Sequence, residues 1–137
     1  MPHTKFRVEI LTPDGDVFDD EVEMVSTRTT LGSIGVLANH EPLLGTLEPT
    51  ELRIYRSDTE ILRFAQSEGY IQVGGNHAML LVAEALTPEQ LDVEALRTRL
   101  AEAQSELASA PEGSEASRQA LRAQKRLEVF LKVAEGA

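Results

Sequence analysis

A stretch rich in glycine and proline, residues 31–49, is the most conspicuous candidate for a chemical or binding role. It reads LGSIGVLANHEPLLGTLEP and places Gly32, Gly35 and His40 among aliphatic side chains. Phosphate-binding P-loops carry a Lys followed by Ser or Thr and lead into a helix. The stretch has neither feature, so a phosphate-binding loop of that type is disfavoured. An apolar loop of this kind forms core, a structural turn or an exposed contact surface, and composition does not choose among the three.

The other residues that could perform chemistry do not form a recognisable site. His3, His40 and His77 lack a local metal-ligand spacing such as H-x-x-x-H. The sequence has no cysteine and no G-x-S-x-G nucleophile motif. The acidic run at residues 19–21 lacks the spacing of an EF-hand and is predicted to be a solvated turn. We therefore predict no catalytic residue and no metal site.

Composition and charge narrow the range of partners. The 137 residues include 42% hydrophobic residues and carry a formal net charge of −10, which indicates a folded chain that repels phosphate backbones and anionic lipids. We expect no nucleic acid partner. No apolar run approaches the ~20 residues needed to span a bilayer, and the N-terminal MPHTKFRVEI resembles no signal peptide. We expect a cytosolic chain without direct membrane insertion.

Residues 1–86 have the pattern of a β-sandwich or barrel. Phe6, Val8 and Ile10 alternate with polar residues, a period of two that places the apolar side chains on one face of a strand. Short strands separated by Gly, Pro, Asn and Asp, without a long helical pattern between them, are typical of antiparallel sandwiches and barrels. The further strands that we predict span residues 21–27, 51–55, 60–65, 70–73 and 77–82.

Residues 87–137 are predicted to form an antiparallel two-helix hairpin. Thr87, Pro88 and Gln90 provide an N-cap, a first-turn proline and a capping-box partner. The first helix should end near Pro111, and the second should begin at about Ser114. The apolar stripe consists of Leu96, Leu100, Ala103 and Leu107 on the first helix and Ala116, Ala120, Ala123, Leu127, Phe130, Leu131 and Ala134 on the second.

The predicted hairpin has opposite charges on its two helices and a narrow apolar face. Residues 88–110 carry two basic and five acidic groups, whereas residues 114–135 carry five basic and three acidic groups. Helices in water draw most of their stability from packing against a larger body. We therefore expect this hairpin to detach and extend.

Residues 32–43, GSIGVLANHEPL, resemble the signature of the epsilon subunit of bacterial F-type ATP synthase, G-E-[IL]-G-[IVL]-[LY]-P-G-H-x-P-L. The stretches VEILTPDGDVFDDEVEMVS and SEGYIQVGGNHAMLLVAEA and the closing Ala/Leu/Arg-rich helices are similar to the same family, in the same order. Ser33 replaces the usual Glu, and Ala38 and Asn39 replace Pro-Gly, so the charge and stiffness of this stretch depart from the family pattern.

The resemblance implies a noncatalytic rotor subunit whose sandwich binds the γ subunit and the c-ring, at the cytoplasmic face of the cell membrane. It also implies that the C-terminal hairpin inhibits ATP hydrolysis when it extends along γ toward the catalytic β subunit and the α subunit. The residues assigned to the c-ring contact are Leu31, Gly32, Ser33, Ile34, Gly35, His40 and Pro42. The cations assigned to the catalytic-subunit contact are Arg118, Arg122, Lys125 and Arg126.

Some members of that family bind ATP on the folded hairpin through I-D-x-x-R-A and arginines of the second helix. The matching positions here are Glu94, Arg97 and Arg126, whereas Phe130 stands where a further arginine would be. Losing a cationic phosphate partner lowers affinity, so we predict weak or absent ATP binding and no other cofactor. Two rival functions stay open: a coupling or assembly subunit that never inhibits, and a small sandwich enzyme or ligand-binding module.

Overall fold

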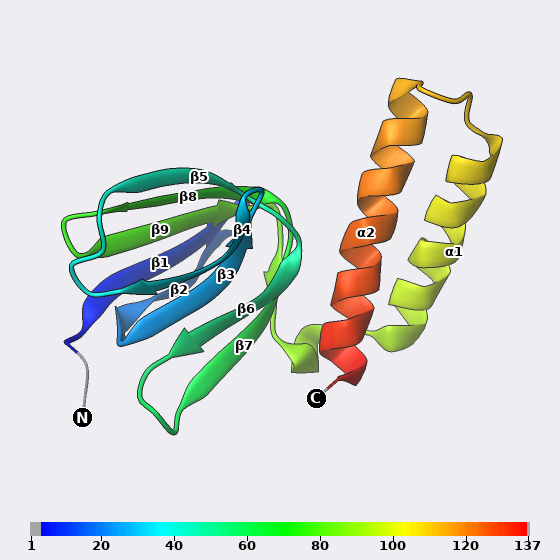
Figure 1. Cartoon of the computed structure of the whole chain (residues 1–137). Helices are drawn as coiled ribbons and strands as arrows, with labels where there is room; N and C mark the ends of the chain where they lie inside the picture. The colour runs from blue at the N-terminus through cyan, green and yellow to red at the C-terminus, as the bar shows by residue number, and fades with distance from the viewer. Residues whose placement is uncertain (1–3, 137) are drawn as a thin grey trace.

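The computed structural model describes residues 4–136, in which a nearly closed β-sandwich is followed by two helices (Figure 1). This confirms the fold predicted from the sequence. The division into domains at residues 86 and 87 stays a prediction, although the last strand ends at Leu86. The strands are β1 (Phe6–Thr12), β2 (Gly15–Val22), β3 (Met24–Thr29), β4 (Gly32–Leu37), β5 (Leu43–Leu47), β6 (Thr50–Tyr55), β7 (Ile61–Gln66), β8 (Gly69–Gly74), β9 (His77–Val82) and β10 (Ala85–Leu86).

The strands form two layers that are joined at one edge. One layer runs β10-β7-β6-β3 and the other β5-β8-β9-β1-β2, and the layers meet where Thr29 of β3 pairs with Leu47 of β5. Strand β4 is an edge strand that pairs with β3. We predicted an antiparallel sandwich, but β1, which lies between β9 and β2, runs parallel to β9 and antiparallel to β2.

The core lies between the two layers, as the alternating pattern predicts. Phe6, Val8 and Ile10 are buried, whereas Arg7 between them is exposed. Buried Leu52 and Ile54 extend the same alternation on β6. Because this core contains no residue of the two helices, it gives the sandwich its own source of stability.

Residues 31–49 are not the loop that we expected. Most of them belong to β4 and β5, with Ile34 and Val36 facing the core and Ser33 and Gly35 facing solvent. The acidic run at residues 19–21 is likewise part of β2 and not a turn. Strands β4 and β5 were missed, and the strand predicted at residues 21–27 contains only the end of β2 and the first part of β3, because few side chains of β2, β4 and β5 are apolar and buried. On β2 only Phe18 and Val22 are buried.

The helical part begins later than predicted. Gln90 Oε1 accepts a 2.9 Å hydrogen bond from the Thr87 N–H, but this local cap closes only the short 3₁₀ turn Pro88–Gln90. Helix α1 (Val93–Ser109) instead starts at Asp92, whose side chain caps the Ala95 N–H. Helix α2 (Glu115–Glu135) starts at Ser114 as predicted. Among the described residues, no helix is long and apolar enough to cross a bilayer.

The two helices pack on each other, and α2 makes the main contact with the sandwich. Helix α2 lies between the sandwich and α1 and contacts β6 and β7 (Figure 1). Ala116 of the predicted apolar stripe is exposed, whereas Val133, outside that stripe, is buried. A cluster that we call the hairpin core contains one buried sandwich residue, Ala65 of β7, together with Leu96, Ala103, Leu127, Phe130 and Val133, and partly buried Leu86 of β10 packs against it.

Candidate functional site

The residues predicted to contact the c-ring lie at two ends of β4. Leu31, 98% exposed, occupies the β3–β4 turn, where Thr29 Oγ1 accepts a 3.1 Å hydrogen bond from its N–H. Gly32 follows with φ +129°, a conformation that a residue with a Cβ rarely adopts. A strand of this length spans about 20 Å, so β4 separates Leu31 from His40. Ser33 and Gly35 lie along the strand between these ends.

The opposite end of β4 carries the predicted contact residues His40 and Pro42. Asn39 adopts φ 64° and donates its N–H to Asn76 Oδ1 at 2.5 Å, while Asn76 Nδ2 donates to Asn39 Oδ1 at 3.2 Å. Asn tolerates this left-handed conformation better than most residues. It therefore fills the place of the family's Gly and ties the β4–β5 turn to the β8–β9 turn. The His40 ring lies 2.6 Å from the Glu41 carbonyl oxygen.

An apolar row on the outer sandwich surface was missed by the sequence analysis. Tyr70 pairs with Leu81 and Leu81 pairs with Leu11, so the three side chains cross β8, β9 and β1 in line. Tyr70 is 60% exposed and Leu81 is 43% exposed. Together with Pro13 they line a groove of about 440 Å³. The sequence feature that could have revealed this row is Leu81, an apolar residue at a position of β9 where the alternating pattern expects a polar, outward-facing one.

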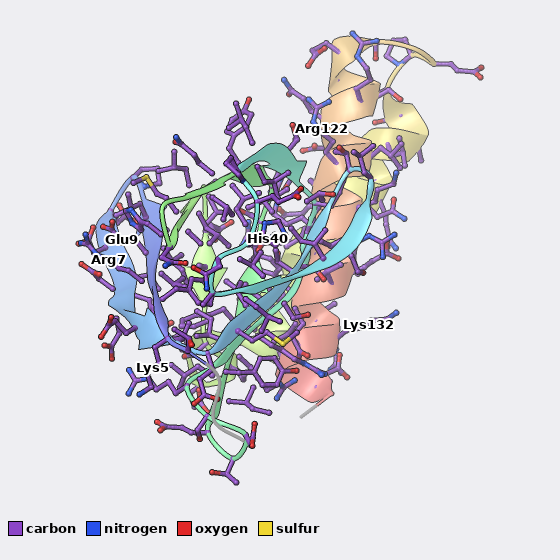
Figure 2. All side chains as sticks on the ribbon, turned by 60° about the vertical axis from the view of Figure 1, so that its left-hand side comes forward. Lys5, Arg7, Glu9, His40, Arg122 and Lys132 are labelled. Carbon is purple, nitrogen blue, oxygen red and sulfur yellow. The ribbon has the colours of Figure 1, made fainter. Side chains whose placement is uncertain are left out.

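The four cations assigned to the catalytic-subunit contact do not act as one group in the folded hairpin. Arg118 and Arg122 both pair with Glu115, at 2.8 and 3.3 Å, in the first half of α2. Their hydrogen bonds lower the pKa of the Glu115 carboxyl. Figure 2 shows Arg122 well above Lys132 along α2. Arg126, farther along the helix, faces the sandwich.

Arg126 forms the polar link between hairpin and sandwich. Its Nε lies 2.9 Å from Glu68 Oε1 and its Nη2 lies 3.5 Å from Glu68 Oε2, with the side chains 24% and 32% exposed. Glu68 lies in the β7–β8 turn, and within residues 4–136 no other ion pair joins the two helices to the sandwich. A two-point guanidinium–carboxylate contact, partly shielded from water, is stronger than an exposed pair. We call the Arg126–Glu68 pair the latch.

Reversing one of the two charges of the latch should release α2 from the sandwich, and reversing both charges should dock α2 again. Arg126→Glu places two carboxylates together, so the docked hairpin should lose about 2 kcal/mol. Adding Glu68→Arg should recover most of the stability that the docked hairpin has lost. Hydrogen exchange of α2 amides in the isolated chain measures both effects, with Arg99→Glu on the exposed surface of α1 as the control. Equal exchange in the single and double variants would mean that the latch contributes nothing.

The residues predicted to bind ATP are not gathered by the folded hairpin. Arg97 lies 3.3 Å from Glu94 and 3.4 Å from Glu135. Glu135 is nine residues from Arg126 on α2, or about 14 Å along the helix axis at 1.5 Å per residue. Phe130 is fully buried in the hairpin core. Weak or absent ATP binding stays a prediction.

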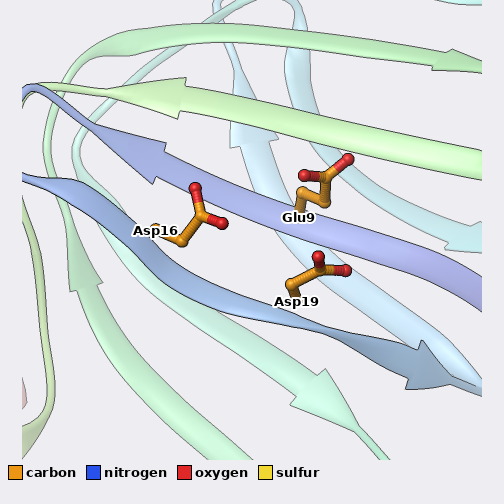
Figure 3. A group of neighbouring side chains, drawn as sticks. All are labelled: Glu9, Asp16 and Asp19. Atoms are coloured by element: carbon orange, nitrogen blue, oxygen red, sulfur yellow. The ribbon is translucent and has the colours of Figure 1, made fainter.

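A small acidic group lies on the sandwich surface. Carboxylate oxygens of Glu9, Asp16 and Asp19 lie within 4.8 Å of one another (Figure 3). Arg7 approaches Asp19 at 3.0 Å, and His77 Nε2 lies 2.6 Å from Glu9. Hydrogen bonding to Arg7 lowers the pKa of Asp19. Glu9 and Asp19 already have basic partners, and the absence of a metal site stays a prediction.

Comparisons with known proteins give a family match. The profile of the ATP synthase delta/epsilon chain β-sandwich domain matches residues 5–88. The chain is similar to the ATP synthase epsilon chain of Thermosynechococcus vestitus, with 35% identity over 131 residues and 94% of each chain covered. It is also 38% identical over 102 residues to that of Persephonella marina, covering 74% of this chain and 75% of the relative.

Two solved structures contain chains of similar fold. One, in the OSCP/F1/c-ring structure of Euglena gracilis mitochondrial ATP synthase, gives a TM-score of 0.73 at 26% identity, covering 92% of this chain and 77% of that one. The other, in the central stalk/c-ring structure of Tetrahymena thermophila mitochondrial ATP synthase, gives a TM-score of 0.61. The match covers 98% of this chain and 99% of that one. The second is 16% identical and shows the fold alone.

Proposed function

Because the chain belongs to the delta/epsilon chain family of ATP synthase, we propose that it is a noncatalytic rotor subunit of the central stalk. In this role it joins the γ subunit to the c-ring and restrains ATP hydrolysis when its hairpin extends. The observation that carries the regulatory part is the narrow attachment of the hairpin. It has its own core, which the sandwich meets through buried Ala65 and partly buried Leu86, and one ion pair to the sandwich among the described residues.

The sandwich offers two surfaces for the two rotor partners. The exposed β3–β4 turn with Leu31 suits a contact with the polar loops of the c-ring. The apolar row of Tyr70, Leu81 and Leu11 suits the γ subunit, since exposed apolar surface of this kind marks protein contacts. His40 and Pro42 lie at the other end of β4, so a c-ring contact that includes them must extend along this strand.

Inhibition and docking compete for Arg126. In the docked hairpin this side chain is held by Glu68. In the extended hairpin it joins Arg118, Arg122 and Lys125, and the four cations reach an acidic loop of the catalytic β subunit, flanked by the α subunit. Attraction between such groups weakens as salt is added. We therefore propose that inhibition is strongest at low ionic strength.

Deleting residues 88–137 tests this function in the ATP synthase complex. The sandwich has a separate core, so the shortened chain should fold and co-purify with γ and the c-ring. ATP hydrolysis by the complex should rise several-fold, because the inhibitory element is gone. If hydrolysis does not rise, the chain is a coupling or assembly subunit without inhibitory activity. If neither form co-purifies with ATP synthase subunits, the enzyme or ligand-binding alternative gains support.

Two further proposals follow from the family. The chain is held at the cytoplasmic face of the cell membrane through the c-ring and not by inserting into lipid. ATP acts at most as a weak regulatory ligand, since Glu94 and Arg97 lie far along the hairpin from Arg126. Calorimetric titration of the isolated chain with ATP checks this, and a tight saturable site that is lost in Arg97→Ala would contradict it.

A further inference from the structure

Glu68 takes part in two surface features at once, the latch and the groove beside the apolar row. Its carboxylate pairs with Arg126 of α2, and the same residue lines the groove together with Tyr70 and Leu81. Among the described residues that line this groove, Glu68 is the only charged one. A partner that fills the groove therefore meets the carboxylate that also holds α2 against the sandwich.

The backbone at Glu68 is held firmly against the end of β9. The buried residue before it, Ser67, donates its N–H to the Glu84 carbonyl oxygen at 3.0 Å, and its Oγ accepts the Glu84 N–H at 2.8 Å. The residue after it, Gly69, lies so close to the Leu81 carbonyl oxygen that a Cβ would not fit. The backbone cannot shift between two partners, so only the side chain of Glu68 is able to choose between them.

The charge around the groove favours a basic partner. Asp16 on β2 lies directly opposite Leu11, and it belongs to the acidic group of Figure 3, which Arg7 balances only in part. The apolar row therefore lies between this acidic group and the carboxylate of the latch. Residues 1–86 as a whole carry 14 acidic and 6 basic groups. Such a surface is complementary to an apolar segment that also carries lysine or arginine.

We propose that the groove accepts a partner segment with an apolar side chain next to a lysine or arginine, and that this cation competes with Arg126 for Glu68. The Glu68 side chain is 32% exposed in the latch, so a second cation can reach it. Two cations that share one negative charge repel each other. The incoming segment therefore weakens the latch and favours release of α2. By reciprocity, the latch weakens binding of the segment by the same factor.

The partner segment belongs to the γ subunit, and in this respect the inference rests on the proposed function. The inference adds a link between two contacts of one turn. The contact that joins the sandwich to γ also loosens the attachment of the hairpin, because both depend on Glu68. No separate effector is needed for this link, since the competing cation is part of the rotor itself.

Binding of the full chain to the immobilised γ subunit, without the α and β subunits, tests the competition. Glu68→Gln removes the shared charge and keeps the side-chain shape, so the affinity for γ should fall at least about fivefold. Arg126→Gln removes the competitor, so the affinity should rise about fivefold. Both substitutions break the latch, and only competition for Glu68 gives them opposite effects on binding. When Glu68→Gln is already present, Arg126→Gln should have no effect.

Two controls and one groove variant complete the experiment. Asp58→Asn in the β6–β7 turn and Arg99→Gln on α1 remove exposed charges outside the groove and the latch, and should leave the affinity unchanged. Tyr70→Ala should weaken binding without changing hydrogen exchange of α2 in the free chain, because it alters the groove and not the latch. Circular dichroism of each variant confirms that it folds.

The outcomes separate this inference from the proposed function. Affinity changes of the same sign in Glu68→Gln and Arg126→Gln, or no change in either, would overturn the competition and leave the binding of γ in place. Full binding by Tyr70→Ala would show that γ does not use the groove and would overturn the inference as well. If the unaltered chain does not bind γ at all, both the inference and the proposed rotor function are wrong.

Discussion

Replacing Phe130 by Ala should release the helical hairpin and leave the sandwich folded. Phe130 is 0% exposed and lies in the hairpin core with Ala65 of β7 and Leu96 of α1. Truncating a fully buried Phe typically costs about 3–5 kcal/mol, from lost burial and from the cavity left behind. Two helices that pack on a larger body through a small surface are only marginally stable. The loss of about 3–5 kcal/mol therefore exceeds the free energy that keeps the hairpin folded and docked.

Hydrogen exchange measured along the chain separates the two parts. In Phe130→Ala, amides of α1 and α2 should exchange much faster, whereas amides of β1 and β9 should keep their protection, because the sandwich core contains no helix residue. Leu121→Ala is the matched control, since Leu121 lies on the same helix but is 42% exposed. Loss of protection in both helices and strands at once would mean that the chain unfolds as one unit.

Replacing Gly69 by Ala should destabilise the sandwich itself. A Cβ at Gly69 would overlap the carbonyl oxygen of Leu81 and lie 2.8 Å from the Cα of Val82. Both atoms belong to the backbone of β9, which pairs with β8 along its length. The backbone cannot move aside as a flexible side chain can, so the strands must separate. We expect a loss of about 3 kcal/mol in the free energy of unfolding.

Gly74 provides an internal comparison for Gly69. It lies at the other end of β8, where an added Cβ meets no atom within 4 Å. Gly74→Ala should therefore leave the free energy of unfolding nearly unchanged, and urea titration of both variants measures the difference. Equal effects of the two substitutions would show that the contact of β8 with β9 at Gly69 is not the cause.

Regular alternation of apolar residues made several strands predictable from the sequence. The pattern of Phe6, Val8 and Ile10 fixed the inner face of β1, and His77–Val82 was predicted with the bounds that β9 has. Strands β4 and β5 and most of β2 were missed because each contains only one or two buried apolar residues. Ile34 and Val36 do alternate, but the neighbouring glycines led to the prediction of a loop.

At the start of α1, tertiary packing prevents the capping box at Thr87 from starting the long helix. The contact between Thr87 and Gln90 forms as predicted, yet Leu91 turns to an extended conformation with ψ 131° and packs against the hairpin core. The helix then needs a second cap, Asp92. Capping chemistry identifies a turn, but burial of an apolar residue decides whether the helix continues.

The candidate functional residues were harder to predict than the fold because their partners are distant in sequence. Glu68 is 58 residues from Arg126, and nothing in either local sequence indicates the latch. The apolar row joins three strands through their register. Leu31 and His40 are close in sequence, but β4 holds them apart. Such relations depend on the pairing of strands and helices and not on local patterns.

The central claim is that inhibition requires the hairpin to leave the sandwich, and a reversible crosslink tests it directly. The chain has no cysteine, so Thr50→Cys on β6 and Glu128→Cys on α2, which line the same cleft, accept a reducible thiol crosslinker specifically. In the ATP synthase complex, the crosslinked hairpin should leave ATP hydrolysis fast, and reduction should restore inhibition. Hydrolysis that is equally slow before and after reduction would contradict the account.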